Sequence, residues 1–180
     1  MAFSSWFPWE RYSTSFSLFL PLTGGGPCAK GKKAGGPPAG AQEAVILAVV
    51  DGLGGGIGSL IIRRLRDLLG GEIEIIALGT NAIATSAMMK AGANRGASGE
   101  NAIAVVAQEV DILLGPMAVV VANSMMGELT PKMAEAISSA RAKKILLPLA
   151  LNRLELIGVS GEPLPHLVEM GVQRVKELIG

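Results

Sequence analysis

Residues 45–58 read VILAVVDGLGGGIG and join an unbroken apolar run to a glycine-rich turn. The run Val45–Val50 is typical of a strand that is buried on both faces of a parallel sheet. After the turn, apolar residues recur at helical spacing from Ile57 to Leu68. A glycine-rich turn that follows a strand and opens a helix is the context in which such turns bind phosphate groups.

The glycine spacing in this turn is G-x-x-x-G-x-G, and it resembles the cofactor turn of short-chain dehydrogenases. We expect the first glycine to make the tight turn, the middle ones to leave the backbone bare for a pyrophosphate, and the last to let the helix pack closely on the sheet. The helix N-terminus then offers free amides and a positive dipole end to an anion. The cofactor-binding residues predicted from this pattern are Gly52, Leu53, Gly54, Gly55, Gly56, Ile57 and Gly58. A tight connection whose ligand site is vestigial is the alternative interpretation.

The rest of the chain alternates between apolar runs of strand length and segments with helical periodicity. After the first strand, the expected strands are residues 73–78, a short one near 93–97, 110–114, 144–149 and 154–159. The expected helices are residues 57–68, 82–91, 98–108, the ambiguous run 116–126, 130–140, and a last one from Pro163 and Pro165 to Ile179. Ser98 and Thr130 are expected to cap their helices. The alternation predicts an α/β fold, a Rossmann-like three-layer sandwich with a mostly parallel sheet of about five or six strands.

The composition excludes several classes of function. A net charge of +1 creates no field that attracts nucleic acid. One cysteine, Cys28, and one histidine, His166, exclude a disulfide framework and a metal site built from several such residues. No apolar run approaches the roughly 18 residues of a membrane span. We therefore expect no metal, no nucleic-acid partner, no membrane partner and a cytoplasmic location.

The N-terminal part of the chain differs sharply in composition from the rest. Every aromatic residue lies at or before Phe19, and residues 23–41 are rich in glycine and proline. Such a segment buries too little apolar surface to offset the entropy of ordering it. We predict that residues 1–43 are a disordered or dispensable extension and that residues 44–180 form the Rossmann-like domain. An anchor for a membrane surface or a partner is the alternative role for the extension.

Several longer segments carry a resemblance to a known family. They read AVVDGLGGGIG from Ala48, ALGTNAIATSAMMKAGAN from Ala77, ASGENAI from Ala97, and DILLGP, ANSMMGELTPKMAEAI, KKILLPL and EPLPHL further on. From Val45 onward the chain resembles a bacterial domain-of-unknown-function family of short Rossmann-like proteins. The resemblance implies a cytoplasmic domain that starts near Val45, and it implies no particular activity.

The turn departs from a dinucleotide site in two respects. Asp51 stands directly before the turn, where its carboxylate repels a pyrophosphate unless it points away, bridges a cation or holds a hydroxyl. The second strand also lacks the acidic residue that commonly binds ribose hydroxyls at its end. That end carries Thr80 and Asn81, which either bind a ribose more weakly or cap the next helix. We therefore expect no strong preference between NAD and NADP.

Polar residues are expected to gather where the strands end, because ligands of open α/β sheets bind at that edge. This set comprises Asp51, Thr80, Asn81, Asn94, Arg95, Ser98, Glu100, Asn101, Asn123, Ser124 and Glu128. Glu128 is the best free acid or base among them, and with Asp51 it is the weak catalytic candidate. The tyrosine acid of a short-chain dehydrogenase is missing, since Tyr12 is the only tyrosine and lies in the extension.

Three functional hypotheses remain open at this point. The first is a nucleotide-binding protein with NAD(P) or another nucleotide as cofactor, either a small reductase or a ligand sensor. The second is an enzyme of another class that acts on a small phosphorylated or nucleoside substrate through Asp51 and Glu128. The third is a non-catalytic oligomeric interaction module. A homo-oligomer is expected, because 49% of the residues are hydrophobic and only 17% are charged, too few to cover every helix face.

Overall fold

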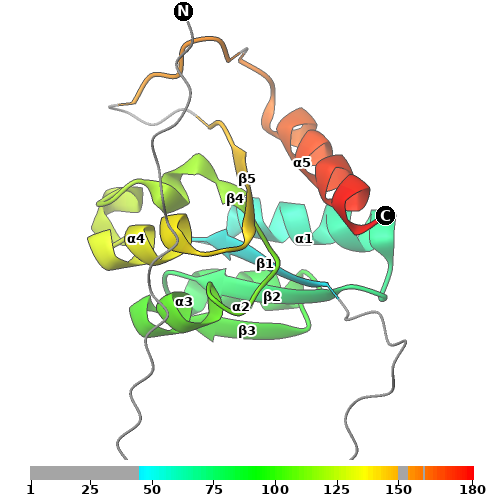
Figure 1. Cartoon of the computed structure of the whole chain (residues 1–180), viewed down its shortest axis with the longest axis horizontal. Coiled ribbons are helices and arrows are strands. Elements are labelled where there is room, and N and C mark those ends of the chain that lie inside the picture. The colour runs from blue at the N-terminus through cyan, green and yellow to red at the C-terminus, as the bar shows by residue number, and fades with distance from the viewer. Residues whose placement is uncertain (1–44, 150–153, 160) are drawn as a thin grey trace, which may run out of the picture. The chain divides into compact units, whose positions relative to one another are not determined.

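The computed structural model describes residues 45–149, 154–159 and 161–180, so the expected extension at residues 1–43 lies outside the described residues. Five parallel strands form a single sheet in the order β3-β2-β1-β4-β5 (Figure 1). The strands are β1 (Ile46–Asp51), β2 (Glu74–Gly79), β3 (Arg95–Ser98), β4 (Ile112–Pro116) and β5 (Lys143–Leu147). Their burial explains the apolar runs, since four of the five residues that follow Ile46 in β1 are apolar and all five are buried.

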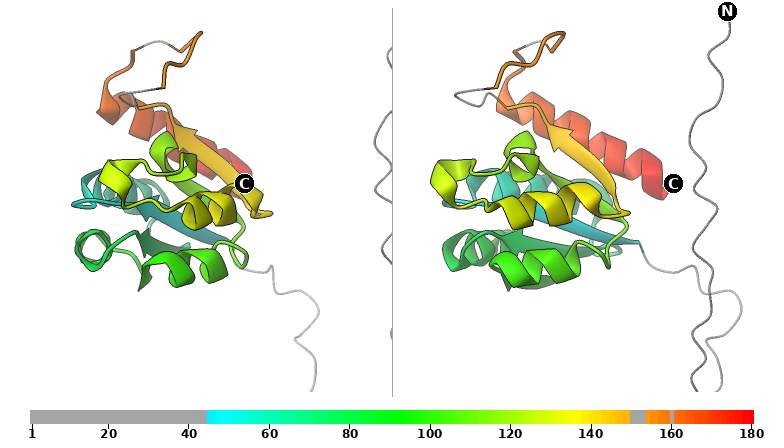
Figure 2. Two further views of the ribbon diagram at one scale, coloured as in Figure 1. Left: turned by 90° about the vertical axis from the view of Figure 1, so that its left-hand side faces the viewer. Right: turned by 60° about the vertical axis from the view of Figure 1, so that its left-hand side comes forward.

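Helices cover both faces of the sheet, as the turned views of Figure 2 show. Leu47 and Val49 of β1 face the layer of α1 (Gly56–Leu69), α2 (Ala82–Lys90) and α5 (Leu164–Ile179). Ala48 and Val50 face the layer of α3 (Glu100–Val106) and α4 (Pro131–Ser139). Successive strand residues point to opposite faces, so each strand supplies both cores. The expected Rossmann-like three-layer sandwich is confirmed.

The carboxyl ends of β1 and β4 lie side by side at one edge of the sheet. These strands are neighbours, but α1 follows β1 on one face while the chain after β4 packs on the other. Such a topological switch point is where open α/β sheets bind their ligands. Gly115 sits at this point, and a Cβ placed there would lie 2.5 Å from the carbonyl oxygen of Val50. The two strands therefore approach each other more closely here than a side chain would allow.

Two of the expected elements are wrong. Leu154–Val159 is not a sixth strand, since Leu154 makes only an isolated bridge and a turn follows at Ile157 and Gly158, where φ is 85°. Its apolar side chains are exposed, because the segment has no continuous strand partner among the described residues. The run 116–126 is not a helix either. It holds two short 3₁₀ turns, Met117–Val120 and Met125–Gly127, separated by left-handed backbone at Asn123.

Two of the three side-chain helix caps considered from the sequence are present in the structure. The side-chain oxygen of Asn81 accepts from the Ala84 amide, and the Thr130 hydroxyl accepts from the Met133 amide. The expected cap at Ser98 is wrong, because Ser98 is the last residue of β3 and Gly99 is the N-cap of α3. Gly99 has a φ of 91°, a conformation that glycine adopts without a steric cost. The chain therefore turns from β3 into α3 without a side-chain cap.

Candidate functional site

Asp51 lies at the end of β1 and is only 3% exposed. Its carboxylate accepts hydrogen bonds from the amides of Gly52 at 2.8 Å and Gly58 at 2.7 Å. The Ile57 amide lies near enough to lower the pKa of this carboxyl as well. Asp51 therefore points into the fold and caps the first turn of α1 from beneath. Of the arrangements considered from the sequence, the geometry corresponds to the one in which this carboxylate points away from the surface of the turn.

Glu128 reaches the glycine turn from the loop between β4 and α4. Its Oε2 accepts from the Leu53 amide at 2.8 Å, the Thr80 hydroxyl at 2.7 Å and the Asn81 side-chain amide at 2.7 Å. Asn81 also donates to the carbonyl of Leu53 at 3.0 Å. One carboxylate oxygen thus joins the turn after β1, the end of β2 and the loop after β4. The sequence identified these residues but gave no sign that they bind one another.

Two amides of the glycine turn, those of Gly54 and Gly56, have no hydrogen-bond partner within the part of the chain that the structure describes. The Gly55 amide is satisfied by the Gly52 carbonyl at 2.9 Å. No atom lies within 4 Å of a Cβ built at Gly54 or Gly56, so both backbones are open to a ligand. The turn keeps two exposed donors at the switch point.

The other glycines of the turn are required by packing. A Cβ at Gly52 would lie 2.5 Å from Met125 Sδ and 2.7 Å from the Thr80 hydroxyl. A Cβ at Gly58 would overlap Met88 and lie 2.9 Å from Asp51 Cβ, which agrees with the close helix packing expected there. The five glycines of the turn therefore divide into two open positions, Gly54 and Gly56, and three that the packing of the fold requires.

Backbone strain gathers at the same edge of the sheet. The non-glycine residues with positive φ in the described segments are Leu53 (52°), Asn123 (60°), Met125 (53°) and Met126 (60°). Left-handed backbone is costly for leucine and methionine, although asparagine tolerates it, and such strain concentrates at functional sites. All four lie in the two loops that Glu128 connects. Leu53 is 46% exposed and Met126 is 95% exposed, so both loops present apolar surface to solvent.

Not every residue of the expected polar set lies at this edge. Asn94 and Arg95 lie at the opposite, amino edge, because β3 begins at Arg95. Asn94 accepts from the Ile75 amide at 2.8 Å, and Arg95 pairs with Glu74 at 2.6 Å. The expectation for these two residues is therefore wrong.

Two further members of the polar set bind other parts of the protein. Glu100 accepts from the Thr130 hydroxyl at 2.6 Å and pairs with Lys132 at 3.3 Å. Ser124 donates to the Ala118 carbonyl at 2.6 Å. The contacts of Glu100 join α3 to the start of α4, whereas that of Ser124 lies within the loop between β4 and α4.

The pKa values of the two carboxylates at this site are shifted in opposite directions. Burial raises the pKa of Asp51 above its ordinary value of 3.8, although the amides of Gly58, Gly52 and Ile57 oppose this and the charge of Glu128 adds to it. Hydrogen bonds from Thr80, Leu53 and Asn81 hold the pKa of Glu128 below its ordinary value of 4.5. Glu128 therefore stays ionised at neutral pH and is a weak proton donor there. Asp51 is the group of the pair that protonates more readily.

This difference predicts opposite effects of acid on stability. Because the folded-state pKa of Asp51 is raised, the contribution of Asp51 to the free energy of unfolding grows as pH falls through that pKa toward 3.8. The contribution of Glu128 is present above 4.5 and is lost as pH falls through its lowered pKa. Urea unfolding should be measured from pH 7 to pH 3. On acidification, the free energy of unfolding of the wild type should rise relative to that of Asp51→Asn. Relative to Glu128→Gln, the free energy of unfolding of the wild type should fall on acidification. If both differences stay constant with pH, both pKa directions are wrong.

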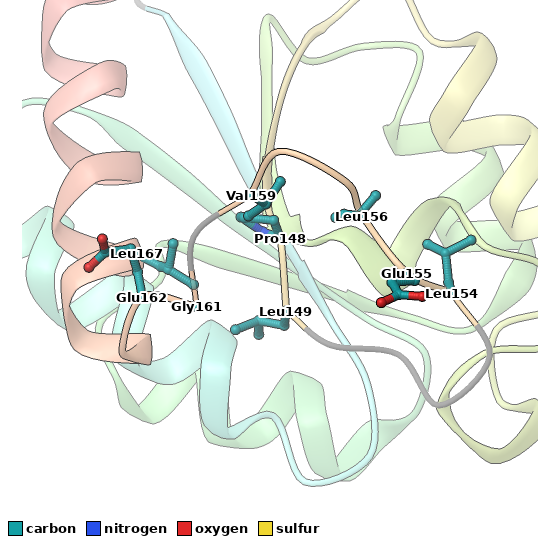
Figure 3. A pocket seen from close by; sticks show the side chains of 9 residues that line it. All are labelled: Pro148, Leu149, Leu154, Glu155, Leu156, Val159, Gly161, Glu162 and Leu167. Atoms are coloured by element: carbon teal, nitrogen blue, oxygen red, sulfur yellow. The ribbon is translucent and has the colours of Figure 1, made fainter.

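Two hollows in the described surface lie away from this site. One of about 330 Å³ is lined by the segments that join β5 to α5 and by the start of α5, including Leu149, Leu156, Val159 and Leu167 (Figure 3). The other, of about 390 Å³, lies against α2 around Ile83. Neither contains a residue of the glycine turn.

The described segments lack a metal-binding cluster and a membrane-spanning helix. They contain no group of three or more His, Cys, Asp or Glu residues placed to hold a metal ion. Within the same segments, no helix combines the length and the apolar character that crossing a membrane requires.

A single parallel sheet in this strand order, with a glycine-rich turn after β1, defines a Rossmann-like α/β protein. The chain belongs to the family described as "Domain of unknown function (DUF3842)", whose model matches residues 46–180. This confirms the resemblance found in the sequence. No curated protein matches the chain.

Solved structures of universal stress proteins show a similar arrangement. One, from Archaeoglobus fulgidus, is 16% identical with a TM-score of 0.34, and the match covers 57% of this chain and 97% of that one. Another universal stress protein, solved in complex with cAMP, is 20% identical with a TM-score of 0.32, with the same two coverages. At these identities the similarity concerns the fold alone.

Proposed function

We propose that this domain binds a nucleotide at the carboxyl edge of β1 and β4, with a phosphate group on the open glycine turn. The observation that carries the proposal is the pair of free amides at Gly54 and Gly56, where no Cβ obstructs an approaching anion. They lie at the switch point, at the N-terminus of a 14-residue helix. Exposed apolar side chains of Leu53 and Met126 lie on the loops beside them and suit the face of a base better than bare phosphate does.

Asp51 limits how strongly the turn can hold a phosphate. It already takes the amide of Gly58 and lies near that of Ile57, so a ligand receives two amides and part of the helix dipole. The amide bonds to Asp51 stabilise its charge in part, although burial still raises its pKa above the ordinary value. We therefore expect the affinity to depend on contacts to the sugar and base as well as on the phosphate. No reaction is proposed, because both carboxylates are engaged by the fold itself.

A thermal-shift panel of NAD, NADP, FAD, ADP-ribose and mononucleotides tests the proposal. At 100 times its Kd, a ligand stabilises the wild type by about 2.7 kcal/mol, which is roughly 8–13 °C in Tm for a domain of this size. Gly56→Asp should abolish that shift, because it places a side chain and a negative charge where the phosphate approaches. The unliganded Tm should change little, since the position is open.

Gly71→Asp is the matched control, because Gly71 is equally open and lies just beyond the other end of α1. This variant should keep the full ligand shift. If no nucleotide moves the wild-type Tm, the turn is structural and the proposal is wrong. If a nucleotide stabilises Gly56→Asp as well as wild type, the ligand binds elsewhere.

Several expectations remain proposals beside this one. NAD(P) as the cofactor, a cytoplasmic location and a dispensable extension at residues 1–43 stay predictions from the sequence. The expected homo-oligomer gains support from the exposed apolar side chains of Leu154, Leu156, Ile157 and Val159, which lie together on one segment. The enzyme and interaction-module hypotheses remain the alternatives to nucleotide binding.

A further inference from the structure

We propose that Glu128 is the ribose-binding residue of this site and makes it select nucleotides whose ribose hydroxyls are free over those with a 2′-phosphate. The proposal rests on the proposed nucleotide site and names the class of ligand that the site takes. It differs from the expectation drawn from the sequence. There, the lack of an acidic residue after β2 predicted similar affinities for nucleotides with and without a 2′-phosphate.

The position of Glu128 carries this inference. In a dinucleotide fold, an acidic side chain at the end of the second strand binds the ribose hydroxyls. Here β2 ends at Gly79, and the next two side chains, those of Thr80 and Asn81, both donate to Glu128 at 2.7 Å. A carboxylate from 48 residues further along the chain therefore occupies the end of β2 that the local sequence leaves without an acid.

The hydrogen bonds of Glu128 leave half of its carboxylate for a ligand. The three bonds from the described residues all end on Oε2. Oε1 has no partner among those residues and can accept from a ribose hydroxyl. The third bond comes from the Leu53 amide, directly beside the open amide of Gly54. The sugar-binding oxygen and the phosphate-binding amides thus belong to one connected surface.

The charge of Glu128 supplies the selectivity. The same hydrogen bonds hold its pKa low, so it is ionised at neutral pH. A ribose hydroxyl donates to this carboxylate, whereas a 2′-phosphate brings two negative groups together without a donor between them. Among the described residues, the side chains that donate to the Glu128 carboxylate are those of Thr80 and Asn81, and both are neutral.

Calorimetric titration with ADP-ribose and with its 2′-phosphorylated form tests the inference. The full-length wild type should bind ADP-ribose at least about tenfold more tightly, as expected for a like-charge contact. Glu128→Gln keeps an acceptor oxygen but loses the charge, so the ratio should fall to about threefold or less. Glu135→Gln, on the exposed face of α4, makes the same change in net charge and should keep the wild-type ratio.

The outcomes separate the inference from the proposed function. If the wild type binds both probes equally, or if Glu128→Gln keeps the discrimination, the role of Glu128 is wrong while nucleotide binding stands. If neither probe binds, both proposals fail. Raising the salt concentration from 0.05 to about 0.5 M provides a test that needs no variant, because screening should weaken the discrimination. A ratio that does not change with salt would overturn the electrostatic basis of the inference.

Discussion

Replacing Gly55 by alanine is expected to lower the free energy of unfolding by about 3–5 kcal/mol, a loss of roughly 10 °C or more in Tm. Gly55 has a φ of 68°, and a Cβ there would lie 2.6 Å from the carbonyl oxygen of Ala84 and 2.8 Å from its Cα. The left-handed backbone alone costs an L-residue about 1–2 kcal/mol. The contact adds to this because backbone atoms of α2 cannot move aside as a flexible side chain can. Urea unfolding measures the loss.

The neighbouring glycines provide the controls for this prediction. Alanine at Gly54 or Gly56 meets no atom within 4 Å, and neither residue has positive φ. These two variants should unfold at the wild-type midpoint or slightly above it, because alanine reduces the entropy of the unfolded chain by up to about 1 kcal/mol. Equal losses at all three positions would show that the packing of the turn against α2 is not the cause.

Replacing Asp51 by alanine is expected to cost about 3–4 kcal/mol at neutral pH. The change leaves the buried amides of Gly52 and Gly58 without the carboxylate that satisfies them. Each buried donor left without a partner costs about 1–3 kcal/mol. The substitution also removes the side chain that caps α1. The N-cap residue of this helix is Gly55, which makes no side-chain hydrogen bond. Denaturant unfolding at pH 7 tests this expectation.

Asp111→Ala provides a matched comparison. Asp111 also accepts from a backbone amide across the sheet, that of Ile46 at 2.8 Å, but this single bond is exposed. Water replaces an exposed partner, so we expect a loss of about 1 kcal/mol or less. Equal losses for the two aspartates would show that burial of the bonds to Asp51 does not determine their contribution.

Local sequence patterns predict much of the fold. The apolar runs of β1, β2 and β4 predict buried parallel strands, and the dipeptide Thr130-Pro131 predicts the start of α4. Residues 154–159 show where this reasoning stops. Their composition favours a strand as strongly as that of β5, yet strand formation depends on a partner in the sheet, which a single segment cannot specify.

The site was only partly predictable for a related reason. The glycine turn is continuous in sequence, so Gly52–Gly58 stands out directly. The bond between Glu128 and Leu53 joins residues 75 positions apart, and no local pattern reports it. Left-handed backbone at Met125 and Met126 is equally hidden, because methionine carries no preference for it. Sequence reasoning therefore identified Glu128 as a candidate but not the groups that it binds.

The long reach of Glu128 bears on the order in which the protein folds. Its carboxylate closes chain segments of 75, 48 and 47 residues at once, whereas the turn it contacts forms among neighbours a few positions apart. Contacts between distant residues form slowly, because the entropy of loop closure must be overcome first. The nascent β1–α1 unit can therefore adopt its glycine turn early, but the contacts of Glu128 with Leu53, Thr80 and Asn81 form only when β4 and the loop after it have docked. A truncated chain that ends before Glu128 would retain the motif without the assembled site.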